Sequence, residues 1–141
     1  MPRLFRYAGA LLVLFGGAIH LSLYADGYSS IPRIGTVFLI NVADAVLIAL
    51  ALAFRPIGAF ALAALVFSVA TMGAFLLSRT TGILGFKEAG WDTKAAAAFA
   101  TEALSIAVIG VWFSATRPKR EARPLVGARQ AEPSAPGPSA A

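Results

Sequence analysis

Four long apolar stretches occupy the first 116 residues of this chain, and short segments rich in Gly, Pro and charged residues separate them. An α-helix needs about 20 residues to cross the hydrocarbon core of a bilayer, with a range of roughly 17 to 25. By this criterion we expect spans at Tyr7 to Tyr24, Thr36 to Phe54, Ile57 to Ser78 and Lys94 to Thr116. The predicted fold class is all-α, a four-helix transmembrane bundle within residues 1–116.

The breaks between the expected spans have local causes. The segment from Asp26 to Pro32 combines an Asp-Gly turn with a proline that cannot continue a helix. Arg55 and Pro56 end the second span, and a proline is tolerated in the first turn of the third, so these two spans should form a tight antiparallel hairpin. The longer loop from Arg79 to Thr93 mixes glycines with apolar residues, which is typical of a segment at the membrane interface.

The composition agrees with a membrane protein. Apolar residues make up 58% of the chain and charged residues 13%, against roughly 45 to 50% and 25% in soluble domains. The absence of cysteine excludes disulfides, thiolate metal sites and cysteine nucleophiles. The net charge is +5, but basic residues gather directly after the last span, at Arg117, Lys119, Arg120, Arg123 and Arg129. That position is typical of a flank facing anionic lipid, so we expect a lipid bilayer as partner and no nucleic acid.

The basic residues also predict an orientation. Of the 12 Lys and Arg residues, eight lie in the N-terminus, the second loop and the tail, and four lie in the first and third loops. The positive-inside rule then predicts that both termini are cytoplasmic. Arg3 and Arg6 before an apolar run also resemble a signal peptide, but no small-x-small cleavage site follows, so we expect the first span to be retained. The Pro- and Ala-rich tail, residues 117–141, should be disordered.

Three of the spans contain strongly polar side chains well inside the apolar run: His20, Asn41 with Asp44, and Glu102. An ionisable group in hydrocarbon costs roughly 2.5 to 3.5 kcal/mol, so such residues usually face the bundle interior or a water-filled cavity. At about 1.5 Å rise per residue, His20 lies roughly 6 Å below the outer boundary, Asn41 roughly 8 Å, and Asp44 and Glu102 roughly 12 Å. We therefore expect one polar cluster in the outer half of the membrane.

Three interpretations of this cluster stay open. The side chains can form a structural network that fixes helix register, or a site for protons, a cation or a small ligand. They can also hold a divalent metal through His20, Asp44 and Glu102, but the chain has one histidine and lacks a Glu-x-x-His pair. No cofactor is predicted.

Aromatic and charged residues of the first and third loops are further candidates for a lid or binding surface, with interfacial anchoring as the alternative. They are Tyr24, Tyr28, Arg33, Glu88 and Trp91. Nothing in the chain matches a nucleophile elbow, a phosphate loop or a dinucleotide fingerprint.

Several short motifs resemble a group of small four-helix bacterial integral membrane proteins with no known activity. They are His20-Leu21-x-x-Tyr24, Ile31-Pro32-x-Ile34-Gly35-x-x-Phe38-Leu39-x-Asn41, Gly85-Phe86-x-Glu88 and, in the fourth span, Glu102. The resemblance covers most of residues 7–116. It implies a four-span protein of the bacterial cytoplasmic membrane and brings no activity, cofactor or substrate.

The sequence thus leads to a multi-pass membrane protein, for which we expect no enzymatic activity. Its first functional interpretation is an accessory or partner-binding subunit that associates with itself or with a larger membrane complex. The alternative is a small proton- or cation-coupled transporter, or a ligand-binding membrane protein, that uses the His, Asp and Glu side chains within the membrane.

Overall fold

The computed structural model describes residues 2–55 and 57–116, and this part of the chain folds into four long helices. In chain order the elements are α1 (Pro2–Ala25), the 3-10 helix η1 (Tyr28–Ser30), α2 (Ile34–Phe54), α3 (Gly58–Thr80) and α4 (Thr93–Thr116). The expected all-α architecture of four helices is confirmed. The helix α1 begins at Pro2, earlier than the Tyr7 expected, because proline is tolerated where a helix N–H has no partner. The tail expected to be disordered, residues 117–141, lies outside the described residues.

All four helices are long and apolar enough to cross a membrane. Large apolar side chains point outward on each of them, among them Leu11, Leu47, Val66 and Leu104, which are 54 to 66% exposed. A soluble monomer rarely exposes contiguous apolar surface on this scale. The described helices therefore suggest a membrane-embedded, multi-pass protein.

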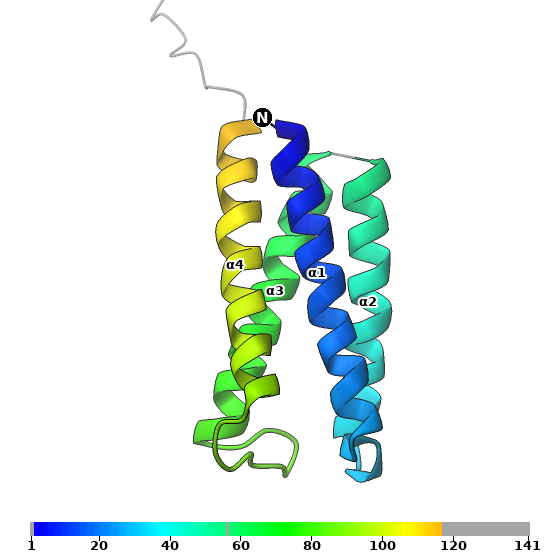
Figure 1. Ribbon diagram of the computed structural model, residues 1–141, viewed down its shortest axis with the longest axis vertical. Helices are drawn as coiled ribbons and strands as arrows, with labels where there is room; N and C mark the ends of the chain where they lie inside the picture. The colour runs from blue at the N-terminus through cyan, green and yellow to red at the C-terminus, as the bar shows by residue number, and fades with distance from the viewer. Residues whose placement is uncertain (1, 56, 117–141) are drawn as a thin grey trace, which may run out of the picture.

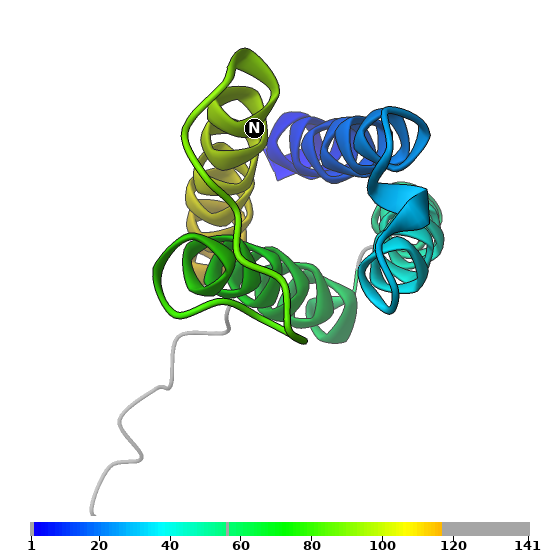
Figure 2. The same cartoon turned by 90° about the horizontal axis from the view of Figure 1, so that it is seen from below.

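The helices form a ring in which each packs beside its neighbours in sequence and α4 closes the ring against α1 (Figure 2). The start of α1, the α2–α3 junction and the end of α4 lie at one end of the bundle (Figure 1). We call this the terminal end, and the opposite end, which carries η1 and the loop before α4, the loop end. Contacts are most extensive between α1 and α2, and sparse between α2 and α3.

Small residues allow α1 to approach α2 closely. A Cβ atom built on Gly17 would lie 2.7 Å from the Cβ of Ala45, a separation that real Cβ atoms essentially never adopt. Ala45 itself is fully buried. Glycine at position 17 thus sets the distance between these two helices, as small residues do where helices associate in lipid.

The apolar core fills only the terminal half of the bundle. Its buried members come from the first half of α1 and α3 and the second half of α2 and α4: Ala10, Val13, Ala45, Ala49, Leu52, Ala61, Ala64, Ile109 and Trp112. Because the chain runs up and down, these residues share one level. The bundle is tightly packed at the terminal end, and the loop half has no comparable apolar core among the described residues.

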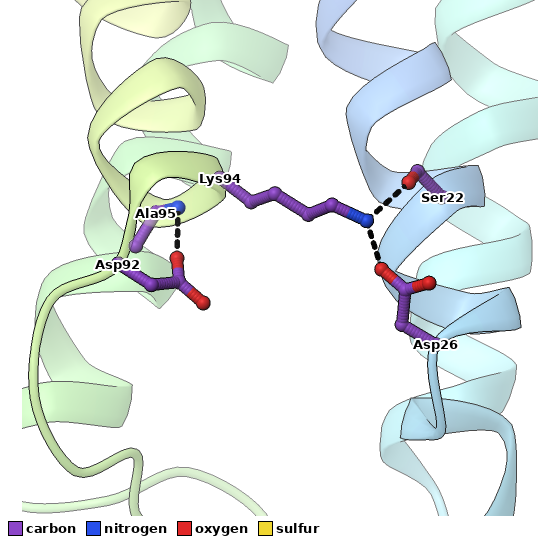
Figure 3. A network of polar contacts seen from close by, with 5 residues as sticks. All are labelled: Ser22, Asp26, Asp92, Lys94 and Ala95. Atoms are coloured by element: carbon purple, nitrogen blue, oxygen red, sulfur yellow. Dashed lines mark hydrogen bonds and ion pairs between the residues drawn. The ribbon is translucent and has the colours of Figure 1, made fainter.

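At the loop end, α1 and α4 are linked by polar contacts (Figure 3). The Nζ atom of Lys94 donates a hydrogen bond of 2.7 Å to the hydroxyl of Ser22 and forms an ion pair with Asp26. Asp92 accepts a 2.7 Å hydrogen bond from the backbone N–H of Ala95, as an N-cap residue does. Both ends of the ion pair are about half exposed, at 44% and 51%, so it fixes geometry more than it adds stability.

Close packing at Gly17 predicts a specific sensitivity. Gly17→Ala should lower the free energy of unfolding by about 1 to 3 kcal/mol, the usual cost of inserting an extra methyl group into a packed interface. The measurement is the thermal unfolding midpoint in detergent micelles. Gly73→Ala is the matched control, because a Cβ there meets nothing within 4 Å and alanine is the better helix former. Equal effects of the two substitutions would contradict the close-packing account.

Candidate functional site

A cavity of about 450 Å³ lies in the loop half of the bundle, and half of its lining residues come from α2 and α3. These two helices make few contacts with one another. The loop between α3 and α4, residues 81–92, lines it at the loop end, and Figure 2 shows this loop running over the ends of α3 and α4. The cavity has room for a small organic molecule, since ligand sites commonly measure roughly 300 to 1,000 Å³.

Three of the four intramembrane polar residues line this cavity: His20, Asn41 and Asp44. They lie on two adjacent helices at increasing depth from the loop end. At about 1.5 Å per residue, His20 is about 8 Å from the end of α1, Asn41 about 10 Å from the start of α2, and Asp44 about 15 Å. Asp44 is the eleventh of the 21 residues of α2 and so lies at the midpoint of that helix.

His20 is held in a defined orientation by its own helix. Its Nδ1 lies 2.9 Å from the carbonyl oxygen of Gly16, and because a carbonyl can only accept, Nδ1 carries the hydrogen. In the neutral ring the other nitrogen, Nε2, is then a hydrogen-bond acceptor. The edge of the His20 ring also packs against Phe38 of α2, with ring centroids 5.2 Å apart. The cavity wall therefore includes an imidazole with its tautomer fixed.

Asn41 and Asp44 present acceptor atoms without partners. The amide nitrogen of Asn41 donates a 3.0 Å hydrogen bond to Thr71 of α3, whereas its carbonyl oxygen is buried and has no hydrogen-bond partner. Asp44 lines the cavity with its side chain exposed, and no ion pair joins it to a described Lys or Arg. An unpaired acid at the midpoint of a spanning helix is costly, which marks it as a functional candidate.

Aromatic rings form much of the remaining wall. Tyr28 of η1 stacks on Phe38, with centroids 5.1 Å apart and planes 20° from parallel, and meets the edge of Phe86 from the α3–α4 loop. On the opposite side, Phe67 and Phe75 of α3 line the cavity. The site thus combines an apolar, aromatic body with a few convergent polar groups, as ligand sites usually do.

The α3–α4 loop is held by a turn and by side-chain contacts. Residues Ile83 and Phe86 pair through two backbone hydrogen bonds of 2.8 Å, around a turn with positive φ at Leu84 and Gly85. The N–H of Glu88 donates a 2.8 Å hydrogen bond to the carbonyl of Ser78. The hydroxyl of Tyr28 donates a short hydrogen bond to the Glu88 carboxylate, and this contact joins the α3–α4 loop to η1.

Arg79 lies at the loop end of the cavity with its guanidinium against two neighbouring aromatic rings. Its Cζ lies 4.5 Å from the centroid of Phe75 and 4.8 Å from that of Trp91. Cation–π contacts of this kind stabilise a charge that has been partly removed from water. Glu88 and Asp92 line the same end, so the charge of Arg79 has acidic neighbours there.

Glu102 does not line the cavity. Its carboxylate is buried between α1, α3 and α4, against Gly16, where a Cβ atom would lie 3.1 Å from Oε1. The Ser68 hydroxyl faces the carboxylate from α3 but makes no hydrogen bond of normal geometry, and the nearby Ser105 hydroxyl is also without a partner. Glu102 therefore occupies a separate buried position next to the cavity.

The loop residues that the sequence indicates as candidates also divide into some that line the cavity and some that do not. Tyr28, Glu88 and Trp91 line the cavity, whereas Tyr24 and Arg33 do not. Within residues 2–55 and 57–116 no group of three or more His, Asp or Glu side chains is close enough to hold a metal ion, so the metal candidates His20, Asp44 and Glu102 are not gathered into one site.

None of the lining residues of α3 was among the candidates from the sequence, and three of them, Phe67, Thr71 and Phe75, have large or polar side chains on one face. They follow one another at intervals of four residues, which places them on one face of the helix. This spacing was available in the sequence. Arg79 continues the same face within α3, although the sequence predicts that the loop begins at this residue.

Comparison with known proteins adds no family. The chain matches no protein-family model, no curated protein and no solved structure. Functional inference therefore depends on the geometry of the cavity.

The Tyr28–Glu88 contact predicts a change of stability in alkaline solution. Burial and the hydrogen bond to Glu88 raise the pKa of Tyr28 from 10.0 to about 12. Because the folded state holds this proton more tightly than the unfolded state, its contribution to stability is complete below about pH 10 and is lost as the pH rises to about 12.

The thermal midpoint should accordingly fall more steeply over this interval for the native chain than for Tyr28→Phe. Tyr7→Phe, at the terminal end, is the control and should follow the native chain. Parallel losses for the native chain and Tyr28→Phe would count against the folded-state contact.

Proposed function

We propose that this chain is a non-enzymatic, multi-pass membrane protein that binds a small molecule in the cavity between α2 and α3. The observation that supports this most is the concentration of unpartnered polar atoms and aromatic rings around one space, in a bundle whose other half is tightly packed. A protein that needed only a stable bundle would gain by filling this space, because empty volume costs dispersion contacts.

The cavity favours the ligand-binding alternative over the accessory subunit. An accessory subunit needs a distinctive outer surface, whereas the outward side chains of the helices are the ordinary apolar ones of a lipid-facing surface. Association with a second copy or with a larger complex is compatible with ligand binding.

The orientation proposed for the protein places both termini in the cytoplasm and the cavity toward the outer face of a bacterial cytoplasmic membrane. Its support is the excess of Lys and Arg in the segments at the terminal end, eight of 12. The ligand then comes from the outer side or from the outer leaflet. Cysteines introduced at Arg33 and Arg55 and tested with a membrane-impermeant maleimide in intact cells would label only at Arg33 if this orientation is right.

Binding can be tested with three probes that share an indole body and differ in the end group. Tryptamine carries an amine, tryptophol a hydroxyl and indolepropionate a carboxylate. We expect saturable binding of at least one probe, with one molecule per chain, in nanodiscs of phosphatidylcholine. The measurement is isothermal titration calorimetry, with empty nanodiscs subtracted.

A cavity-filling variant connects the binding to this site. Ala74 lines the cavity on α3, so Ala74→Trp should reduce the affinity at least tenfold by occupying the space. Ala63→Trp is the matched control, because Ala63 is exposed on the same helix and does not line the cavity. The absence of saturable binding for all three probes, or equal loss in both variants, would refute the proposed function.

A further inference from the structure

The geometry points to an amine as the polar group of the ligand, bound as an ammonium ion by Asp44, with Asn41 on the same face of α2 about one helical turn away. This inference rests on the proposed function and specifies its ligand class: an organic cation with an N–H donor and an apolar or aromatic body. It follows from which atoms at the deep end of the cavity lack partners.

The deep end offers hydrogen-bond acceptors. The carbonyl oxygen of Asn41 is buried without a partner, while its amide nitrogen is already used by Thr71. Nearer the loop end, His20 uses Nδ1 on the Gly16 carbonyl, which leaves the acceptor Nε2 of the neutral ring. An ionised Asp44 can only accept. A ligand group that pairs with Asp44 must therefore donate, and an ammonium group has up to three N–H donors.

Charge selects a cation over a neutral donor. The charged side chains that line the cavity are Asp44, Glu88 and Asp92, which are acidic, and Arg79, which is basic. Arg79 lies at the loop end with Glu88 and Asp92, whereas Asp44 lies at the midpoint of α2 with no basic side chain on its own helix. A cation at the deep end therefore neutralises an acid in surroundings of low dielectric, where the attraction between opposite charges is strong.

The acidic neighbours of Arg79 disfavour the opposite arrangement. An anionic ligand could be attracted to the guanidinium, but Glu88 and Asp92 line that same end and would repel it. Phe75 and Trp91 also contact the guanidinium, with ring centroids 4.5 Å and 4.8 Å from Cζ. The loop end is suited to the apolar body of the ligand, among Tyr28, Phe86 and Trp91.

An aromatic ring near the deep end adds a second attraction for a cation. Phe67 lines the cavity on α3, one turn deeper than Thr71. An ammonium ion over the face of such a ring gains electrostatic stabilisation that increases as water is excluded. The ligand is thus bound with its amine toward the middle of the membrane and its body toward the α3–α4 loop.

The three indole probes test this inference directly. In phosphatidylcholine nanodiscs at neutral pH, tryptamine should bind at least tenfold more tightly than tryptophol, and indolepropionate should bind least. Asp44→Asn should remove the preference by weakening tryptamine at least tenfold while leaving tryptophol within about twofold. The tryptophol affinity also reports whether the variant is folded.

Glu102→Gln is the matched control. It removes the carboxylate of a second buried acid, at a position that does not line the cavity. Its ratio of tryptamine to tryptophol affinity should equal that of the native chain. A lower ratio would mean that Glu102 also supplies negative charge to the bound amine, which contradicts the assignment of that charge to Asp44 alone.

The outcomes separate the inference from the function on which it rests. Saturable binding in which tryptophol or indolepropionate equals tryptamine, or in which Asp44→Asn leaves the preference intact, overturns the amine assignment and leaves ligand binding standing. No saturable binding of any probe overturns both.

Discussion

The close contact of α1 with α2 at Gly17 and Ala45 determines how the rest of the bundle is arranged. With no side chain at position 17, the two backbones approach until the Ala45 methyl group fills the space between them. The remaining face of α1 packs on α4, and α3 packs mainly on α4. The packing around the ring is therefore uneven, and the α2–α3 side contributes least to it. The cavity lies on that side.

The division of the bundle into a packed half and a hollow half has an energetic basis. The terminal half buries alanines, Leu52 and Ile109 in mutual contact, and it includes the short link from Arg55 to Gly58 that keeps α2 and α3 together. In lipid, moving an apolar side chain from hydrocarbon into the protein interior gains little hydrophobic free energy. Van der Waals packing between the helices is therefore a main favourable contribution to their association. The packed half can thus supply stability while the loop half carries partnerless polar atoms that would be costly in a uniformly packed bundle.

The four helices were predictable because length and hydropathy are local properties of the chain. Pro56 and the Asp26-Gly27 turn mark their limits as well. The depth of each polar residue was also predictable, and it placed His20 and Asn41 at levels that the cavity reaches.

The rotation of each helix about its own axis was not predictable from the sequence. Glu102 lies at nearly the depth of Asp44, but it faces Gly16 and Ser68. These helices are apolar on all sides, so the pattern along the sequence does not reveal which face meets the interior. The uneven packing that creates the cavity depends on contacts between helices, and the sequence of a single helix does not reveal it.

The short connection joins α2 and α3 at the terminal end, and a hydrogen bond from Asn41 to Thr71 links them on the side of the cavity. Both helices are longer than 20 residues, so at about 1.5 Å per residue a tilt of a few degrees at the joint shifts their far ends by roughly one to two ångströms. Helices in a bilayer adjust their tilt to its hydrophobic thickness. A change of membrane thickness that tilts one of these helices against the other would therefore change the width of the cavity between them. For the ligand binding proposed above, the rate of exchange would then differ between thin and thick bilayers.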